Sequence, residues 1–190
     1  IESETGRSGE VFRTVQLRRE LIWQGKPVRE HFHATEDHGE VRTAVYTFLQ
    51  SVDFRADVTL LDKPKAQPQT RVSKEEFYKY AWYYHFKHVA PSLLKGKSEA
   101  FICAASVGTN KGQAVYTAAV NDVLQQTVQR QQWKTCFPRA VAEPCLQIAD
   151  YCAWAVQRKF ERGDDKWFKM IEPKFSTVYD LWKTGRREYY

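Results

Sequence analysis

Hydrophobic residues recur at helical spacing most clearly in residues 39–51 of this chain. The apolar positions there follow the i, i+3, i+4, i+7 and i+8 pattern of one helix face, and they are Val41, Ala44, Val45, Phe48 and Leu49. Residues 10–25 are predicted to form an earlier helix that stops at Gly25. The short Phe32-His33-Ala34 segment between these helices is expected to be extended.

Three segments have the pattern of strands. Residues 53–61 alternate apolar and polar positions, with Phe54, Ala56, Val58 and Leu60 on one side, which indicates a strand with one buried face. Residues 100–106 form an apolar run bounded by glycines, and a third strand is predicted over residues 136–141.

Further helices are predicted in the second half of the chain. Ser73 and Glu76 form a capping box before the helical run 77–89, which Pro91 is expected to end or kink. The other helices are expected over residues 112–131, 144–162 and 165–171. Gly163 follows residues 144–162 as a natural C-terminal cap.

This alternation of helices and strands predicts an α/β fold. The chain shows no internal repeat, low-complexity segment or clear linker, so residues 1–175 are interpreted as one domain. Residues 176–190 are interpreted as an aromatic and basic C-terminal tail.

Asp150 is the most informative residue of the predicted helix 144–162. It is a single carboxylate in an otherwise apolar run, and burying a charge is costly unless the charge is paired or bound to a cation. On a helical projection, one apolar arc forms the predicted core face: Cys145, Leu146, Ala149, Ala153, Val156 and Phe160. Gln147, Asp150 and Trp154 form the neighbouring stripe, so Asp150 is expected at the edge of the core.

Composition narrows the class of protein. Hydrophobic residues make up 43% of the chain and aromatic residues 14%, which excludes a disordered chain. No apolar run approaches the roughly 20 residues that span a bilayer, and no signal peptide is visible. We therefore expect a cytoplasmic protein with reduced, buried cysteines and no membrane contact. Because the chain begins at Ile1 and its one methionine is Met170, the natural start is expected upstream.

Two further features bear on partners. The net charge of +6 tolerates or attracts phosphate, although a solvated helix end explains the basic tail equally well. Aromatic residues occur on every side of the helix 77–89, which one core face does not require. A helix covered on two sides or a contact with another protomer or a protein partner is favoured there over a nucleic-acid stacking surface.

The order and spacing of four short elements resemble a known family. These elements are Phe32-His33-Ala34-Thr35-Glu36-Asp37, Val41-Arg42, Asp62-Lys63 and Leu146-Gln147-Ile148-Ala149-Asp150-Tyr151. Over residues 30–172 the chain is similar to the bacterial proteins grouped as domain of unknown function 3800. The resemblance implies a ribonuclease H-like fold, with a central mixed sheet and helices on both faces.

The same resemblance implies a two-metal centre for phosphodiester hydrolysis, held by converging carboxylates and using Mg²⁺ or Mn²⁺. Asp150 would be its late-helix carboxylate, with Glu36, Asp37 and Glu4 as further ligands. Two departures stand out. Ser3-Glu4-Thr5-Gly6 replaces the Asp-Glu-Ser-Gly that ends the first strand of relatives, so that strand is expected to be missing here, and the run 101–106 carries no acid.

Each candidate has a structural alternative. Asp150 could be a partner for an arginine or a helix N-terminus, and His33 could be a hydrogen-bonded core-edge histidine instead of a group that orients water or phosphate. Glu36 and Asp37 could favour the positive end of the following helix. Two residues are candidates for substrate binding. For Lys63 a solvated loop is the default interpretation, and for Gln147 the alternative is hydrogen bonding to the backbone beside Asp150.

Two functions of different class follow. The first is a metal-dependent phosphodiesterase, a nuclease in which Asp150, Glu36 and His33 are catalytic. The second is a catalytically inactive ribonuclease H-like module that binds nucleic acid or a protein partner. The number of carboxylates that converge on Asp150 distinguishes them.

Overall fold

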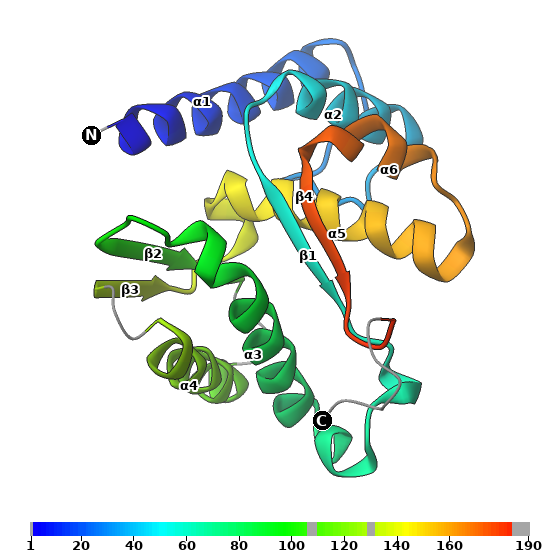
Figure 1. Cartoon of the computed structure of the whole chain (residues 1–190). Helices are drawn as coiled ribbons and strands as arrows, with labels where there is room; N and C mark the ends of the chain where they lie inside the picture. Colours follow the sequence, from blue (N-terminus) through cyan, green and yellow to red (C-terminus); the bar gives the residue numbers. More distant parts are fainter. Residues whose placement is uncertain (1, 106–109, 129–131, 184–190) are drawn as a thin grey trace. The chain divides into compact units, whose positions relative to one another are not determined.

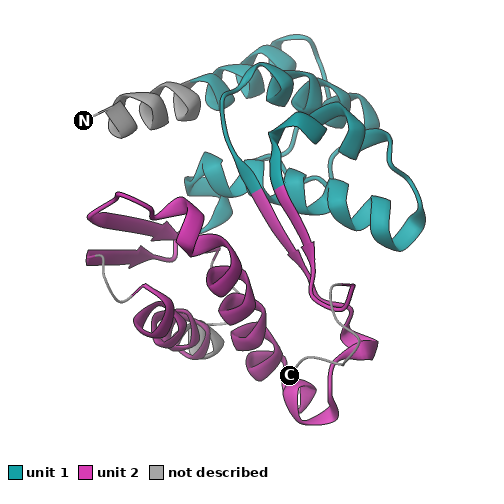
Figure 2. Cartoon of the chain, viewed as in Figure 1, with its two compact units in different colours: residues 1–56, 139–176 teal, residues 57–138, 177–190 magenta. Residues whose placement is uncertain are grey.

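The structure is a computed structural model that describes residues 2–105, 110–128 and 132–183, with the side chains of residues 2–12 and 110–113 left aside. The chain divides into two compact units, each built from two separate segments (Figure 2). Unit 1 comprises residues 1–56 and 139–176, and unit 2 comprises residues 57–138 and 177–190. The assignment of residues 1–175 to one domain stays a prediction, because a compact unit need not be an independent domain.

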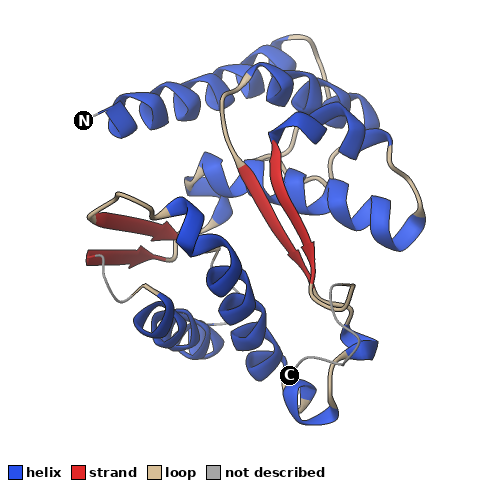
Figure 3. Cartoon of the chain, viewed as in Figure 1, coloured by secondary structure: helices blue, strands red, loops and turns tan. Residues whose placement is uncertain are grey.

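Unit 1 is built almost entirely of helices (Figures 1 and 3). Its α-helices are α1 (Glu2–Trp23), α2 (Gly39–Ser51), α5 (Pro144–Arg162) and α6 (Lys166–Ile171), and short 3-10 turns precede α5 at Ala140–Ala142 and follow α6 at Glu172–Lys174. The helices α2, α5 and α6 share an aromatic core. The ring of Tyr46 lies 5.2 Å from that of Tyr151 and 4.9 Å from that of Trp167, centroid to centroid.

Unit 2 combines helices with short strands. Its elements are β1 (Ala56–Leu60), α3 (Lys74–Leu93), β2 (Glu99–Cys103), α4 (Asn110–Thr127), β3 (Gln132–Cys136) and β4 (Phe175–Asp180), with 3-10 turns at Lys63–Lys65 and Pro68–Arg71. The strands β1 and β4 start at the boundary with unit 1, pair with each other and run in the same direction (Figure 1). The strands β2 and β3 form a second parallel pair, in register from Glu99 opposite Gln132 to Cys103 opposite Cys136.

The core of unit 2 lies between α3, α4 and the β2–β3 pair. Val120 and Leu124 on one side of α4, and Val128 directly after its end, are fully buried. Half-buried residues of α3, the two strands and the connecting loops pack against them, among them Tyr78, Trp82, Phe86, Ile102 and Trp133. The mixed α/β content predicted from the sequence is therefore confirmed. Within the described residues the strands form two separate pairs, not the one central sheet that the resemblance implies.

Several element boundaries match the sequence pattern. The predicted helix 39–51 is α2, and the predicted helix 165–171 differs from α6 by one residue. The Ser73 hydroxyl accepts a hydrogen bond from the Glu76 N–H at 3.1 Å, as the capping box requires. Pro91 lies inside the last turn of α3, which ends at Leu93. Gly25 has a φ of 70°, the left-handed conformation of a C-terminal stop.

Other boundaries were wrong. The strand predicted over residues 136–141 is displaced: β3 ends at Cys136, and Ala140–Ala142 is a 3-10 turn. Pro138 has no N–H to donate, so it cannot continue a ladder beyond that point. Residues 176–180 belong to strand β4, not to a tail, and Leu181 after them is buried. All five residues of β1 are half-buried, so the predicted fully buried face is not seen.

Candidate functional site

The helix α5 carries the candidate residues of unit 1 and has a well-defined start and end. The Glu143 side chain accepts a hydrogen bond from the Cys145 N–H at 3.2 Å, and Pro144 occupies the first turn, where no N–H is needed. At the other end Gly163 adopts a φ of 68° and its N–H reaches the carbonyl groups of the last turn. The predicted helix 144–162 is confirmed, and its fixed ends hold Asp150 in one position along the axis.

The buried face of α5 differs from the predicted one. The buried side chains are Gln147, Tyr151, Cys152, Trp154, Ala155 and Val156. Ala149 and Ala153, which the projection placed in the core, are exposed, as is Phe160. Tyr151 and Trp154 bury far more apolar area than alanine does, and this decides the orientation of the helix. Asp150 consequently borders the core on its polar side, at 39% exposure.

The segment before α2 folds into a tight turn. The carbonyl oxygen of His33 accepts hydrogen bonds from the N–H groups of Glu36 at 3.0 Å and Asp37 at 2.8 Å. This turn leaves the N–H groups of Phe32, His33 and Ala34 without backbone partners. Such groups are costly to bury unless a side chain satisfies them.

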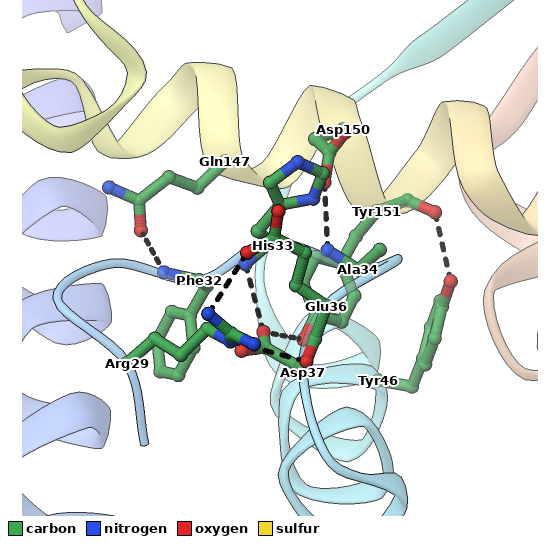
Figure 4. A network of polar contacts seen from close by, with 10 residues as sticks. All are labelled: Arg29, Phe32, His33, Ala34, Glu36, Asp37, Tyr46, Gln147, Asp150 and Tyr151. Atoms are coloured by element: carbon green, nitrogen blue, oxygen red, sulfur yellow. Dashed lines mark hydrogen bonds and ion pairs between the residues drawn. The ribbon is translucent and has the colours of Figure 1, made fainter.

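Three side chains satisfy these three N–H groups in sequence order (Figure 4). Gln147 Oε1 accepts from Phe32 at 3.2 Å, Asp37 Oδ2 from His33 at 2.9 Å, and Asp150 Oδ2 from Ala34 at 2.8 Å. Two of the three acceptors, Gln147 and Asp150, come from α5. They lie 115 and 116 residues along the sequence from the N–H groups that they accept. We define this arrangement of residues 32–37 with Gln147 and Asp150 as the clamped turn.

The imidazole of His33 lies against the same carboxylate oxygen of Asp150. Its Nδ1 is 3.3 Å from Asp150 Oδ2, and the two side chains are 38% and 39% exposed. The contact is an ion pair only when the imidazole is protonated, and Nδ1 makes no hydrogen bond to any residue that the structure describes. The two residues therefore form a His–Asp pair at the surface of unit 1.

Asp37 is the buried acid of the clamped turn, at 2% exposure. Its Oδ2 accepts from the Tyr151 hydroxyl at 2.5 Å as well as from the His33 N–H. Burial first, and then the hydrogen bond to Asp37, raise the pKa of Tyr151, so the phenol keeps its proton and remains a donor. The other oxygen, Oδ1, is buried and has no partner among the residues that the structure describes.

Glu36 and Asp37 are adjacent in sequence but differ in environment. Glu36 is exposed, and its carboxylate is 3.1 Å from the Arg29 guanidinium, whose Nε also donates to the Glu36 carbonyl oxygen at 3.3 Å. Figure 4 shows the Arg29 and Glu36 side chains together beside the turn. An exposed ion pair of this kind contributes little to stability.

The candidate metal ligands lie differently from those of the metal centre that the resemblance implies. Among residues 13–105, 114–128 and 132–183, no group of three or more His, Cys, Asp or Glu side chains is arranged to hold a metal ion. Asp150 and Asp37 direct one oxygen each to backbone N–H groups, and Glu36 pairs with Arg29. The described residues do not fit a two-metal site, which needs several converging carboxylates.

Three further residues were predicted to belong to the site: Glu4, Lys63 and Gln147. Glu4 belongs to α1, and its side chain is among those left aside. Lys63 belongs to unit 2, where its Nζ lies 5.6 Å from the ring centroid of Phe77. Gln147 is fully engaged with backbone, because its Nε2 donates to the Ala140 carbonyl oxygen at 2.9 Å while Oε1 holds Phe32.

Two tyrosines of the site were missed in the sequence. Tyr151 links α5 to Asp37, and the Tyr46 hydroxyl donates to the Tyr151 carbonyl oxygen at 2.9 Å (Figure 4). A tyrosine directly after Asp150 and another on the apolar face of residues 39–51 were the available signals, since buried tyrosines need partners for their hydroxyl groups.

Comparisons of the chain with family models, with curated proteins and with solved structures find no match. The resemblance to the domain of unknown function 3800 therefore stays a prediction. None of the helices in the described part of the chain combines the length and the apolar character that crossing a membrane requires.

Proposed function

We propose that this protein is a non-catalytic, nucleic-acid-binding module in which Asp150 has a structural role. The observation that carries the proposal is the use of both acids in the clamped turn. Asp150 accepts from the Ala34 N–H, and Asp37 accepts from the His33 N–H and the Tyr151 hydroxyl. Carboxylates used in this way stabilise a loop against a helix and are not gathered around a cation.

The charge of the chain supports nucleic acid as the ligand. The net charge is +6 and the isoelectric point about 9.1, so the protein attracts polyanions at neutral pH. Support for a protein partner at residues 77–89 is weaker than the sequence suggested, because α3 is covered on two sides within unit 2. Its Tyr78, Trp82 and Phe86 pack on the α4 core, and His88 stacks on Tyr179 of β4 at 4.0 Å.

One observation favours the metal-dependent phosphodiesterase as a second candidate. The side chains of His33 and Asp150 are each more than one third exposed, so a ligand can reach them. Histidine is the side chain that most often acts as a general acid or base. In that case His33 would position water or phosphate, and Glu36 would have to leave Arg29 to join Asp150.

Binding and cleavage can be measured on the same labelled oligonucleotides. Fluorescence anisotropy with single-stranded RNA, single-stranded DNA and duplex DNA should show affinity that falls between about 50 mM and about 200 mM salt. The oligonucleotides should remain intact with Mg²⁺ or Mn²⁺. Absence of binding at low salt would contradict the proposal.

The variant Asp150→Asn separates the two candidates. Cleavage that requires Mn²⁺ and disappears in Asp150→Asn, at an unchanged melting temperature, would establish the phosphodiesterase instead. A lowered melting temperature with unchanged nucleic-acid binding supports the structural role of Asp150.

A further inference from the structure

Unit 2 contains a groove between α3 and α4 that the proposed function does not yet use. Its cavity has a volume of about 300 Å³. It is lined by Glu76, Lys79, Tyr80 and Tyr83 of α3 and by Val123 and Gln126 of α4. This volume is at the lower end of the range for small-ligand sites. A cavity of this size has room for about one ring system of a ligand.

The groove is formed by a separate face of α3. Positions 76, 79, 80 and 83 follow the i, i+3, i+4, i+7 spacing of one helix side. A different side of the same helix, with Tyr78, Trp82 and Phe86, packs on the buried residues of α4. Tyr80 and Tyr83 are therefore additional to the core, and both are only half-buried.

The charges around the groove balance. Lys79 Nζ lies 2.7 Å from Asp122 Oδ2, and this hydrogen bond raises the pKa of Lys79. Lys87 Nζ lies 5.6 Å above the Tyr83 ring, and Glu76 supplies the second acid. Two cations and two anions leave no net charge to attract a phosphate, so the groove suits an uncharged occupant.

The lining combines planar rings with polar edges. Tyrosine rings offer stacking surfaces, the Gln126 amide offers a donor and an acceptor side by side, and Val123 adds an apolar wall. An uncharged, planar ring with hydrogen-bonding groups along its edge matches all three. We infer that this groove binds one unpaired nucleobase, an inference that rests on the proposed binding of nucleic acid and specifies single strands as the ligand.

The groove itself is tested with free nucleosides, which carry no phosphate. Adenosine and cytidine are titrated into ¹⁵N-labelled protein, and the Gln126 side-chain amide and the Val123 backbone amide are followed by NMR. Shifts at these groups in the wild type, lost in Gln126→Ala, are expected. The matched control is Gln125→Ala, since Gln125 is an exposed neighbour on α4 that does not line the cavity. Shifts that are absent in the wild type, or equal in both variants, would overturn the inference.

The link to single strands is tested with Tyr83→Ala. Loss of one stacked base should weaken single-stranded RNA binding by roughly tenfold while leaving duplex DNA binding unchanged. The salt dependence of binding should also stay unchanged, because the groove contributes no phosphate contact.

Equal weakening on single and double strands would contradict the inference. If the wild type binds nucleic acid but nucleosides cause no shift, only this inference fails. If nucleosides bind and no strand does, the proposed function fails.

Discussion

The side chain of Asp150 accepts a hydrogen bond from the backbone N–H of Ala34 across 116 residues of sequence, at 2.8 Å. This contact, with the parallel one from Gln147 to Phe32, attaches the turn before α2 to the middle of α5. Both segments belong to unit 1. The Asp150 carboxylate thus accepts a backbone N–H and remains 39% exposed to solvent, and this explains how a helix with an apolar sequence tolerates its charge.

The hydroxyl of Tyr151 should contribute more to stability than that of Tyr46. In Tyr151→Phe the buried Asp37 carboxylate loses a charge-assisted donor, and we expect a loss of about 1.5–3 kcal/mol in the free energy of unfolding. In Tyr46→Phe a neutral hydrogen bond to the Tyr151 carbonyl oxygen is lost, at about 0.5–1.5 kcal/mol. Urea denaturation of the two variants measures the difference, and the reverse order would show that Asp37 does not depend on Tyr151.

Replacement of Gln147 should leave the Phe32 N–H without its hydrogen-bond acceptor. In Gln147→Leu the buried Phe32 N–H loses its hydrogen bond, at about 1–3 kcal/mol, while the Ala140 carbonyl oxygen keeps the Glu143 N–H at 3.3 Å. The matched control is Gln157→Leu on the same helix, where an exposed side chain donates a hydrogen bond to the exposed Glu161. The control should change stability by less than about 0.5 kcal/mol. Similar melting temperatures for the two variants would refute the role of Gln147.

Stability should fall in mild acid because of His85. Burial, with a smaller contribution from His88, lowers the pKa of this imidazole, and Asp57 opposes the shift. The folded state therefore binds a proton less readily than the unfolded state. Stability is complete above the unfolded pKa of about 6.5 and decreases as the pH falls through that value toward the lower folded pKa.

Unfolding curves at about pH 7.5 and about pH 5.5 measure this effect. The difference between the two pH values should shrink in His85→Asn. It should persist in His38→Asn, because the His38 side chain is 70% exposed. A pH dependence that is the same in His85→Asn and the wild type would contradict the assignment.

Cys152 should be inert in the native protein. Burial raises the pKa of its thiol to about 12, and only the thiolate reacts with alkylating reagents. Iodoacetamide at about pH 8 should therefore leave Cys152 unmodified in buffer and modify it in urea, as peptide mass spectrometry reports. Equal modification rates in buffer and in urea would show that the aromatic core of unit 1 is open on that timescale.

Local patterns predicted the helices of this chain well, because their signals are contained in a few neighbouring residues. The period of residues 39–51, the Ser73 cap and the Gly163 stop each correspond to a feature of the structure. The position of strand β3 was predicted wrongly because its partner, β2, is about 30 residues away. A short run of residues does not contain the information that sets the pairing of two such distant strands.

The candidate site was predicted in its residues but not in their roles. Asp150, His33 and Gln147 do come together, yet the projection of α5 gave the wrong buried face because it weighted alanines and aromatics alike. Glu36 and Asp37 looked equivalent in the sequence. The turn at His33 directs Asp37 inward to Tyr151 and Glu36 outward to Arg29, and only the folded backbone distinguishes them.

Amide hydrogen exchange at Ala34 tests the central claim most directly, since that N–H donates to Asp150. In the wild type the Ala34 amide should be protected, and Asp150→Ala should remove its protection together with about 1–3 kcal/mol of stability. Asp150→Asn, which keeps an acceptor oxygen, should retain part of the Ala34 protection and part of the stability. An Ala34 amide that exchanges freely in the wild type, with no loss of stability in Asp150→Ala, would contradict the structural role of Asp150.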